Sequence, residues 1–474
     1  MPEKTDSDQN THIFNASVSN QTQTPEINPY LKKTIPEEND QSSNFPKKLL
    51  KTTGLIFILI TLLFAFIAFV LPIFFRQNGV TSGNTVTYWG VSIDESVMNV
   101  VISDFEKINS DIKVTYTKQD LSDYRQRLST RIRNGTGPDV FSYHNSWYPM
   151  FSDVLSPISS NTLDASDIGN DYYPIAEEDL VRNGKVYGVP LEIDTLALFV
   201  NTKLLGDAQV SYPKTWQEFI DGSTKLTSRD QNGKITIAGA AMGTYDNIDH
   251  APDIISLLLA QNGVDLHNIQ KDKSKVEDAI QFYKNFSLVE NSVWDATLDR
   301  SLLAFSEGRA AMVFGYAKDF VNLKKQNPSL PIKVVAAPQL YSAEKKNIGS
   351  YWVEGISSKS KNSDAAQTFL NYLSGPGVLE KIYQEESKLQ GYGRPYSLKS
   401  LSSKIQDSNY SVFLDQASSS QSTPFVDSTF DNGINNDLNN LLKDAISGGG
   451  FGSGAIDKLF QGYSQILGKY SNGF

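Results

Sequence analysis

Two acidic side chains near the middle of the chain stand at a spacing that could support acid–base chemistry. Glu192 and Asp194 alternate within a predicted extended segment, so their carboxylates would point to the same face, about 7 Å apart. Paired carboxylates are the groups that hydrolyse glycosidic bonds. No second catalytic constellation accompanies this pair, so hydrolysis is the minor hypothesis and binding without chemistry is the leading one.

A larger set of residues combines aromatic rings with acids, amides or a guanidinium in loops after predicted strands. Ring faces stack on apolar C–H groups, whereas carboxylates and amides bond to hydroxyls. Tyr124 also fits the apolar stripe of a helix, and Trp89 also fits the end of a strand. The predicted ligand-binding residues are Trp89, Tyr124, Asn145, Trp147, Glu192, Asp194, Tyr245, Asp246, Tyr316, Tyr351, Trp352, Glu354 and Arg394.

Strands and helices that alternate from residue 85 onward must position these side chains. Residues 85–89 and 112–116 read as strands, and a third strand begins at 138–141. The segment Ser92-Ile93-Asp94-Glu95 resembles a capping box that opens a helix. The apolar residues expected on one face of that helix are Val97, Val101, Phe105 and Ile108, and those of the next helix, which stops at Gly135, are Tyr124, Leu128 and Ile132.

The alternation continues in the second half of the chain. We expect a strand at 235–241, helices at 254–260 and 276–289, and a helix opened by Thr215 with Trp216 and Phe219 in the core. Strand–helix–strand succession predicts an α/β fold with right-handed crossovers and a mostly parallel sheet covered on both faces. The length exceeds what one core usually supports, so two lobes are expected.

An apolar run at residues 55–75 is long enough, at about 30 Å as a helix, to span a bilayer. Lys47, Lys48 and Lys51 precede the run and only Arg76 follows closely, which predicts a single-pass anchor with a cytoplasmic N-terminus. A cleaved signal peptide is the alternative, but its apolar core would be shorter. With no cysteine, neither a thioether-linked lipid nor a disulfide is available.

Composition divides the chain into four predicted parts. Residues 1–46 are polar and contain scattered prolines, so we expect a disordered cytoplasmic tail. Residues 47–76 form the transmembrane anchor with its basic flank, 77–84 a linker, and 85–474 the extracellular domain. The formal charge of −10 argues against nucleic acid as a partner.

Several segments, in this order, resemble the extracellular solute-binding proteins that feed ABC importers, in particular the sugar-binding branch similar to maltodextrin-binding proteins. The matching segments are Gly-Thr-Gly-Pro-Asp-Val at 135–140, Asn-Gly-Lys-Val-Tyr-Gly-Val-Pro at 183–190, Leu-Phe-Val-Asn-Thr-Lys at 198–203, Tyr-Pro-Lys-Thr-Trp-Gln-Glu-Phe at 212–219, Phe-Ser-Glu-Gly-Arg-Ala-Ala-Met at 305–312, and Ser-Lys-Asn at 360–362 ahead of 365–373.

This resemblance implies a two-lobed periplasmic-binding-protein-like fold with a hinge and an interlobe cleft. It implies that residues 192–201 make the first crossing between the lobes and that 351–355 lie at the third. It also implies that Trp352 packs against a carbohydrate, and that an ABC transporter permease is the partner. A transmembrane helix here replaces the lipid anchor or free periplasmic form common in the family. A sensor or adhesion module with the same fold remains the alternative.

No cofactor or metal is expected. The four histidines, His12, His144, His250 and His267, lack ligand spacing. The glycines at 448–454 lack the Lys-Ser/Thr of a phosphate loop and read as a flexible connection before a last helix.

Overall fold

The computed structural model describes residues 84–288, 292–341, 344–427, 429, 431–448 and 454–470, all within one compact unit, Val80–Phe474. The predicted tail and membrane-spanning run at 55–75 lie outside the described residues, as does most of the glycine-rich segment. Within the described ranges, no helix combines the length and apolarity needed to cross a membrane.

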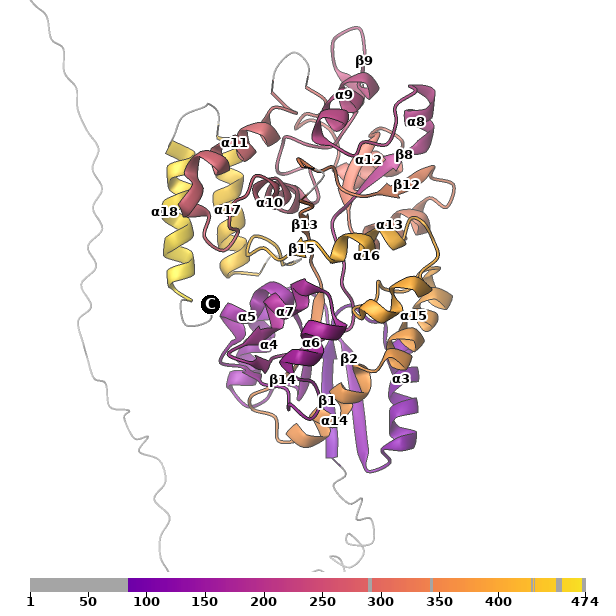
Figure 1. Cartoon of the computed structure of the whole chain (residues 1–474), viewed down its shortest axis with the longest axis vertical. Helices are drawn as coiled ribbons and strands as arrows, with labels where there is room; N and C mark the ends of the chain where they lie inside the picture. The colour runs from indigo at the N-terminus through magenta and orange to yellow at the C-terminus, as the bar shows by residue number, and fades with distance from the viewer. Residues whose placement is uncertain are drawn as a thin grey trace, which may run out of the picture. The chain divides into compact units, whose positions relative to one another are not determined.

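The first lobe is built on a six-stranded sheet in the order β2-β1-β3-β14-β4, with β7 also paired to β14 (Figure 1). β1 runs parallel to β2 and β3, but β14 runs antiparallel to β3, β4 and β7. The sheet is therefore mixed, which corrects the expectation of a mostly parallel one. Its strands are β1 (Asn84–Gly90), β2 (Ile112–Lys118), β3 (Val140–His144), β4 (Leu155–Ser156), β7 (Val189–Pro190) and β14 (Trp352–Ser357).

Helices and short segments complete the first lobe. They are α3 (Glu95–Ile108), α4 (Tyr124–Arg133), η2 (Asn145–Trp147), α5 (Tyr148–Phe151), α6 (Ala165–Asp171), α7 (Pro174–Leu180), the β5–β6 hairpin (Val181–Arg182, Lys185–Val186), α14 (Ser363–Leu373) and α15 (Pro376–Gln390).

The predicted first helix differs in its cap. Asp94, rather than Ser92, is the N-cap of α3, because its carboxylate accepts a hydrogen bond from the backbone N–H of Ser96 at 3.0 Å. Val97, Val101 and Phe105 are buried as expected, whereas Ile108, the last residue of the helix, is 70% exposed.

The second lobe contains a three-stranded sheet in which β8 (Ala197–Asn201) lies between β11 (Met312–Gly315) and β12 (Ile332–Val335) and is antiparallel to both. The further elements are α8 (Thr202–Asp207), α9 (Trp216–Leu226), β9 (Ser228–Arg229), β10 (Ile235–Ile237), α10 (Ala251–Gln261), η3 (Ile269–Asp272), α11 (Lys273–Lys284), α12 (Ser301–Ser306), α13 (Ala317–Gln326), β13 (Asn347–Ile348), α16 (Ser411–Ala417), β15 (Ser420–Gln421), α17 (Ile434–Ser447) and α18 (Gly454–Gly468). The short η4 (Lys399–Lys404) contacts the first lobe, because Lys399 donates to the Gly169 carbonyl at 3.2 Å and Lys404 pairs with Glu380 of α15 at 2.5 Å.

Two predicted elements of this lobe are shorter than expected. The strand at 235–241 ends at Ile237; after it Ala238 forms an isolated parallel bridge with Ala310, and the backbone N–H of Gly239 donates to the Thr227 hydroxyl at 3.1 Å. The helix at 276–289 spans 273–284, and its C-cap is Asn285.

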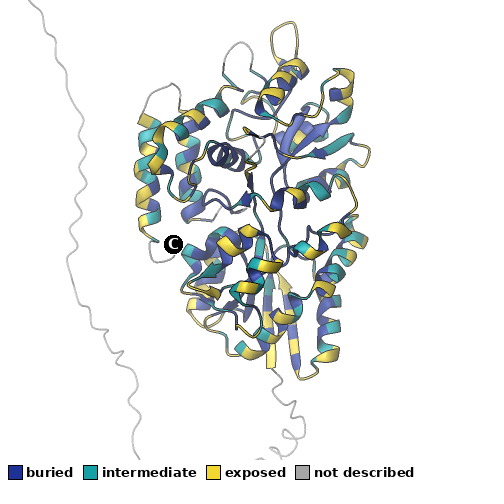
Figure 2. Ribbon diagram, viewed as in Figure 1, coloured by how far each residue is buried: buried dark blue, intermediate teal, exposed yellow. Residues whose placement is uncertain are grey.

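The amphipathic helices of the second lobe confirm the periodicity argument. Thr215 caps α9 in a capping box with Glu218, and Trp216 and Phe219 are buried. α10 is buried on almost every side, as its dark blue ribbon in Figure 2 shows. A helix of this kind is apolar all round because neighbouring elements enclose it.

Three segments join the lobes and lie side by side. Residues 191–196 lead from β7 to β8, residues 349–351 lead from β13 back to β14, and residues 391–398 follow α15 on the way to α16. Tyr351 therefore lies at the second crossing in chain order rather than the third. The hydrogen bonds between these segments are Leu196 N–H to Ile348 O (2.9 Å), Ser350 N–H to Asp194 O (3.0 Å) and Ile193 N–H to Pro395 O (3.3 Å).

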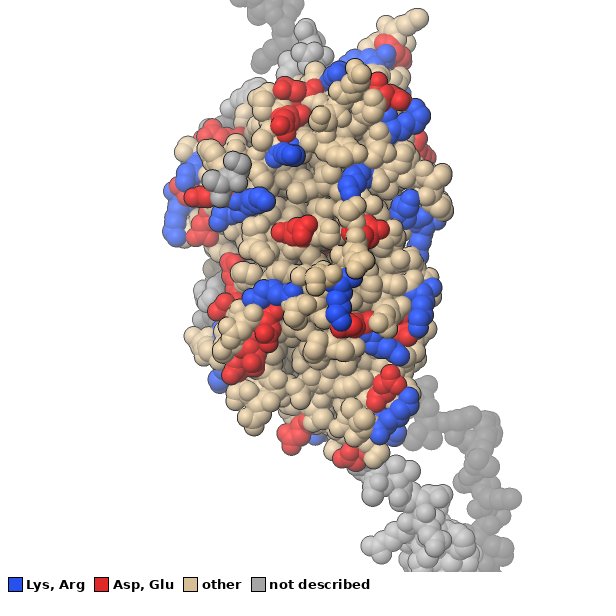
Figure 3. Space-filling view, turned by 45° about the vertical axis from the view of Figure 1, so that its right-hand side comes forward, with Lys and Arg blue, Asp and Glu red and all other residues tan. Residues whose placement is uncertain are grey.

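Charged side chains of both signs are interspersed over the face in Figure 3. On this face, neither sign of charge is gathered in one field.

Candidate functional site

An aromatic cluster lies where the first-lobe sheet meets the crossings. Trp352 opens β14 and stands opposite His144, the last residue of β3. The ring of Trp352 meets Trp147 edge to face at 5.4 Å, His144 at 5.5 Å and Tyr124 at 6.4 Å between centroids. Trp147 and Tyr124 are fully buried, whereas Trp352 is half-buried. Trp352 therefore keeps part of its surface accessible while three rings support it.

The topology of the sheet explains why these residues meet. β1 and β3 are parallel and end at the same edge, where η2 carries Trp147 and where α4 begins with Tyr124. β14 runs the opposite way, so its first residue reaches that same edge. Ligands of open α/β sheets bind at the carboxyl ends of parallel strands.

His144 is a neutral imidazole in this cluster. Its two ring nitrogens lie 2.9 Å from the hydroxyl oxygens of Ser146 and Ser350. Burial, assisted by the nearby Arg125 cation, lowers the pKa of His144 to about 3. The sequence drew attention to the segment 144–147, but His144 itself was not among the predicted ligand-binding residues.

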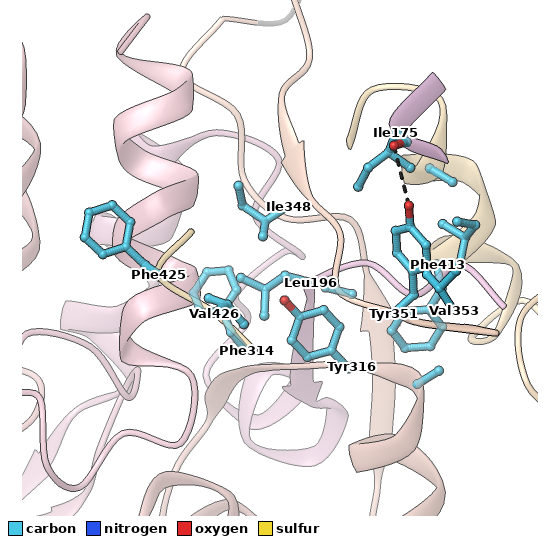
Figure 4. Close-up of a cluster of buried hydrophobic side chains, with 14 of the residues drawn as sticks. Ile175, Leu196, Phe314, Tyr316, Ile348, Tyr351, Val353, Phe413, Phe425 and Val426 are labelled. Carbon is cyan, nitrogen blue, oxygen red and sulfur yellow. Dashed lines mark hydrogen bonds between the residues drawn. The ribbon is translucent and has the colours of Figure 1, made fainter. Parts of the chain in front are cut away.

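Tyr351 and Asn145 connect the second crossing to the first lobe. The Tyr351 hydroxyl donates to the Asp179 carboxylate at 2.7 Å, and the Asn145 amide donates to the same oxygen at 2.8 Å. The Tyr351 hydroxyl also points to the carbonyl of Ile175 (Figure 4). Burial raises the pKa of Asp179 to about 6, although its hydrogen bonds oppose that shift. Both predicted residues therefore brace the fold at the edge of the cluster.

Glu354 and Arg394 belong to a buried polar group beneath the aromatic cluster. Glu354 accepts a hydrogen bond from the Ser142 hydroxyl at 2.9 Å, and burial raises its pKa to about 7. Arg394 is 8% exposed and pairs with Glu386 of α15 and with Glu192 of the first crossing, the latter at 3.2 Å. Arg394 thereby ties a first-lobe helix to two crossing segments.

Asp194 lies at the N-terminus of α13 in the second lobe. Its carboxylate accepts hydrogen bonds from the backbone N–H of Ala317 at 3.0 Å and of Thr195 at 2.8 Å. Burial nevertheless raises its pKa above the usual range. Because Glu192 is held by Arg394 and Asp194 by backbone donors, these two carboxylates are occupied by partners within the fold.

Tyr316, beside Asp194, forms a polar group with His250. The Tyr316 hydroxyl donates to Asp253 at 2.5 Å, and the ring of Tyr316 meets that of His250 edge to face at 5.1 Å. His250 lies 2.8 Å from a carboxylate oxygen of Asp319. Asp319 and Asp253 raise the pKa of His250 against the effect of burial, which favours its charged form.

Three of the predicted ligand-binding residues are not part of the aromatic cluster. Tyr245 and Asp246 lie apart from it, and Trp89 lies at its border. The Tyr245 hydroxyl donates to the Asn439 carbonyl at 3.1 Å, and Asp246 pairs with Lys443 at 2.6 Å, so both contact α17. Trp89 lies beneath the guanidinium of Arg131, 5.7 Å from the ring centroid.

Sequence reasoning missed a buried arginine and its acidic partners. Arg125, in the first turn of α4, is 3% exposed and pairs with Asp427, which also accepts a hydrogen bond from the indole N–H of Trp147 at 3.0 Å. Asp431 accepts from the backbone N–H of Arg125 at 2.6 Å. Some 300 positions separate these partners, so no local pattern could have joined them.

A separate depression of about 460 Å³ lies between α7, η4 and α16. Its lining includes Tyr173, Lys399 and Asp415 and none of the predicted ligand-binding residues.

The sequence profile of bacterial extracellular solute-binding proteins matches residues 90–380. A multiple sugar-binding protein of Streptococcus mutans is 22% identical over 320 residues, which are 64% of this chain and 73% of that protein. A probable amino-acid ABC transporter periplasmic-binding protein of Sinorhizobium fredii is 24% identical over 60% of this chain and 67% of its own length. Among solved structures, a sugar-binding protein of Xanthomonas citri superposes with a TM-score of 0.65 at 22% identity, covering 82% of this chain and 98% of that one.

Proposed function

The chain belongs to the bacterial extracellular solute-binding protein family, and we propose that it captures a carbohydrate between its lobes and delivers it to the permease of an ABC transporter. The observation that carries the carbohydrate assignment is the half-buried ring of Trp352, supported by Trp147, His144 and Tyr124. A partly accessible indole in a fixed orientation offers an apolar face to the C–H groups of a sugar ring.

Hydroxyl recognition would come from the polar groups around this ring. The half-buried hydroxyls of Ser146 and Ser350, which flank the ring nitrogens of the buried His144, present donors and acceptors on one side of the ring. Tyr316 and the charged pair His250–Asp319 present them on the second lobe. A sugar held by both sides stabilises the arrangement in which the lobes approach, because a ligand favours the state that it contacts most.

We propose that the protein binds its ligand and does not catalyse a reaction on it. The carboxylates that could form a hydrolytic pair are already engaged, Glu192 with Arg394 and Asp194 with backbone N–H groups. We further propose that residues 55–75 anchor the chain as a single transmembrane helix, with residues 1–46 in the cytoplasm and residues 85–474 outside. Such a tether would raise the local concentration of the binding domain near a permease.

Amino acids are the second ligand class to test, since one relative is described as an amino-acid binder. A sensor or adhesion module with the same fold is the alternative function, and it would differ in its partner.

The test is a thermal-shift screen of the full-length chain in detergent against mono- and oligosaccharides, polyols, amino acids and polyamines. A ligand that binds only the native state at 100 times its Kd adds about 2.7 kcal/mol to the free energy of unfolding and raises Tm. We expect an oligosaccharide to give the largest shift. A shift with amino acids alone would replace the carbohydrate assignment, and no shift with any compound would favour the sensor or adhesion hypothesis.

A further inference from the structure

The buried Arg125 connects the first lobe to the C-terminal helical hairpin. Its guanidinium contacts the carboxylate of Asp427, the carbonyl of Asp431 and the side-chain oxygen of Asn435, the last at 3.1 Å. The same guanidinium lies over the ring of Trp147, 5.4 Å from its centroid. The arginine thus reaches all these partners from the helix that also carries Tyr124.

The hairpin of α17 and α18 belongs to the second lobe. α17 receives the hydroxyl of Tyr245 on Asn439 and pairs through Lys443 with Asp246. α18 pairs through Asp457 with Lys273 at the start of α11, and Tyr463 donates to the carbonyl of Leu266 at 2.7 Å. The hairpin therefore follows the second lobe when the lobes move.

The Arg125 contact consequently spans the two lobes beside the aromatic cluster. Arg125 is 3% exposed and Asp427 is 2% exposed, so water screens the attraction between their charges little. Asp427 is further fixed by Trp147 and by the N–H and hydroxyl of Thr429, at 3.0 and 2.9 Å. A fully paired, fixed ion pair of this kind favours one relative arrangement of the parts that carry it.

We propose that the Arg125–Asp427 pair, with Asp431 and Asn435, is an interlobe latch that holds the lobes together before ligand binds. The latch raises the populated fraction of the closed arrangement, and the apparent affinity rises in proportion to that fraction. Its effect on affinity rests on the proposed binding function. Its effect on the interlobe distance without ligand does not rest on that function, so the latch and the proposed binding function can fail separately.

The absence of cysteine from the natural chain makes this arrangement measurable. Thr130→Cys on α4 and Ser274→Cys on α11 introduce two exposed labelling sites, one on each lobe. Spin labels on these sites in the full-length protein, in detergent and without ligand, report the interlobe distance by pulsed electron resonance. With the native Asp427 we expect one narrow, short distance; with Asp427→Asn we expect the distribution to shift to longer distances.

The matched control is Asp153→Asn. It removes an ion pair with Arg133, also on α4, but both partners belong to the first lobe. This control should leave the interlobe distance unchanged. Circular dichroism and a thermal melt of each variant would confirm that Asp427→Asn is folded, and Asp431→Asn supplies a second, milder test of the same contact.

The proposal is overturned if the native chain without ligand already shows the long distance, or if Asp427→Asn leaves a short one in place. It is also overturned if Asp427→Asn weakens ligand binding with no change in ligand-free distance, because Asp427 would then act as a ligand contact. Where a ligand is known, Kd should rise by the same factor by which the closed fraction falls.

Discussion

Glu354 is a carboxylic acid in the centre of the first-lobe sheet, where an apolar residue would be expected. It is 1% exposed, and its side chain bonds to Ser142 on the neighbouring strand. Burial penalises the charged form, so the carboxyl retains its proton to higher pH than in the unfolded chain. The sequence placed Glu354 at a ligand site, but its contacts are those of a structural acid.

The raised pKa of Glu354 predicts how the free energy of unfolding depends on pH. The folded pKa of about 7 lies above the ordinary value of 4.5. Below pH 4.5 the carboxyl is protonated in both the folded and the unfolded chain, so it does not change the free energy of unfolding. As pH rises from 4.5 to 7, the free energy of unfolding falls, because the unfolded chain loses this proton more readily. Glu354→Gln has no carboxyl at this position and does not show this fall. Its free energy of unfolding, relative to that of the native chain, should therefore rise by about 3 kcal/mol between pH 4.5 and pH 8.

Urea unfolding of both chains at a series of pH values measures this difference. Glu344→Gln, at an exposed position, is the control and should show little change. A constant difference between Glu354→Gln and the native chain across the whole range would show that the pKa of Glu354 is the same in the folded and unfolded chains.

Trp352 carries the residue-scale prediction for binding. Trp352→Ala should cost at least about 1 kcal/mol of ligand affinity, roughly fivefold in Kd, because a stacking face is lost. Trp352→Phe keeps an aromatic face and should retain much of that affinity. Titration calorimetry measures both, with Tyr341→Ala, which removes an aromatic ring that is 65% exposed, as the control. Unchanged affinity in Trp352→Ala would make the ring purely structural.

At the scale of elements, α9 shows how a short local signal fixes a helix start. The Thr215 hydroxyl accepts from the N–H of Glu218 at 3.2 Å, and the Glu218 carboxylate accepts from the N–H groups of Lys214 and Thr215. Each bond satisfies a backbone donor that the first helical turn leaves free.

Thr215→Ala should therefore lower the free energy of unfolding by about 1 kcal/mol. Thr215→Ser keeps the hydroxyl and should lose much less, which separates the cap from the loss of side-chain packing. The shift of the urea midpoint measures both variants. Equal losses in the two variants would attribute the effect to packing.

Elements that depend on neighbouring residues in the sequence could be predicted, whereas elements that depend on contacts distant in the sequence could not. The apolar stripe of α4 and the alternation of β1 and β2 follow from neighbours in sequence, and the structure confirms them. The direction of β14 depends on the chain leaving for the second lobe and returning, which periodicity does not record. The partners of Arg125 were missed for the same reason, since they come from the far end of the chain.

At the scale of the whole molecule, the proposed membrane anchor gives a separate prediction. The full-length chain should remain with the membrane fraction after alkaline carbonate washing, because an apolar helix of about 30 Å stays in the bilayer. A chain lacking residues 1–76 should appear in the soluble fraction. Protease added outside intact cells should degrade the domain after residue 85 and spare an epitope tag at the N-terminus. A tag released from the membrane together with a shortened mature chain would instead indicate a cleaved signal.

The position of β14 in the first-lobe sheet has a consequence for how the chain matures. β14 lies between β3 and β4, yet it is separated from them in sequence by nearly the whole second lobe. During synthesis, the edge of β3 that pairs with β14 stays unpaired until the chain beyond Ser357 has emerged. Non-local strand pairing of this kind is slow and leaves edges available to wrong partners. A chain whose domain crosses a membrane from residue 85 onward would therefore expose that edge outside the cell first, where chaperones that guard exported proteins would meet it.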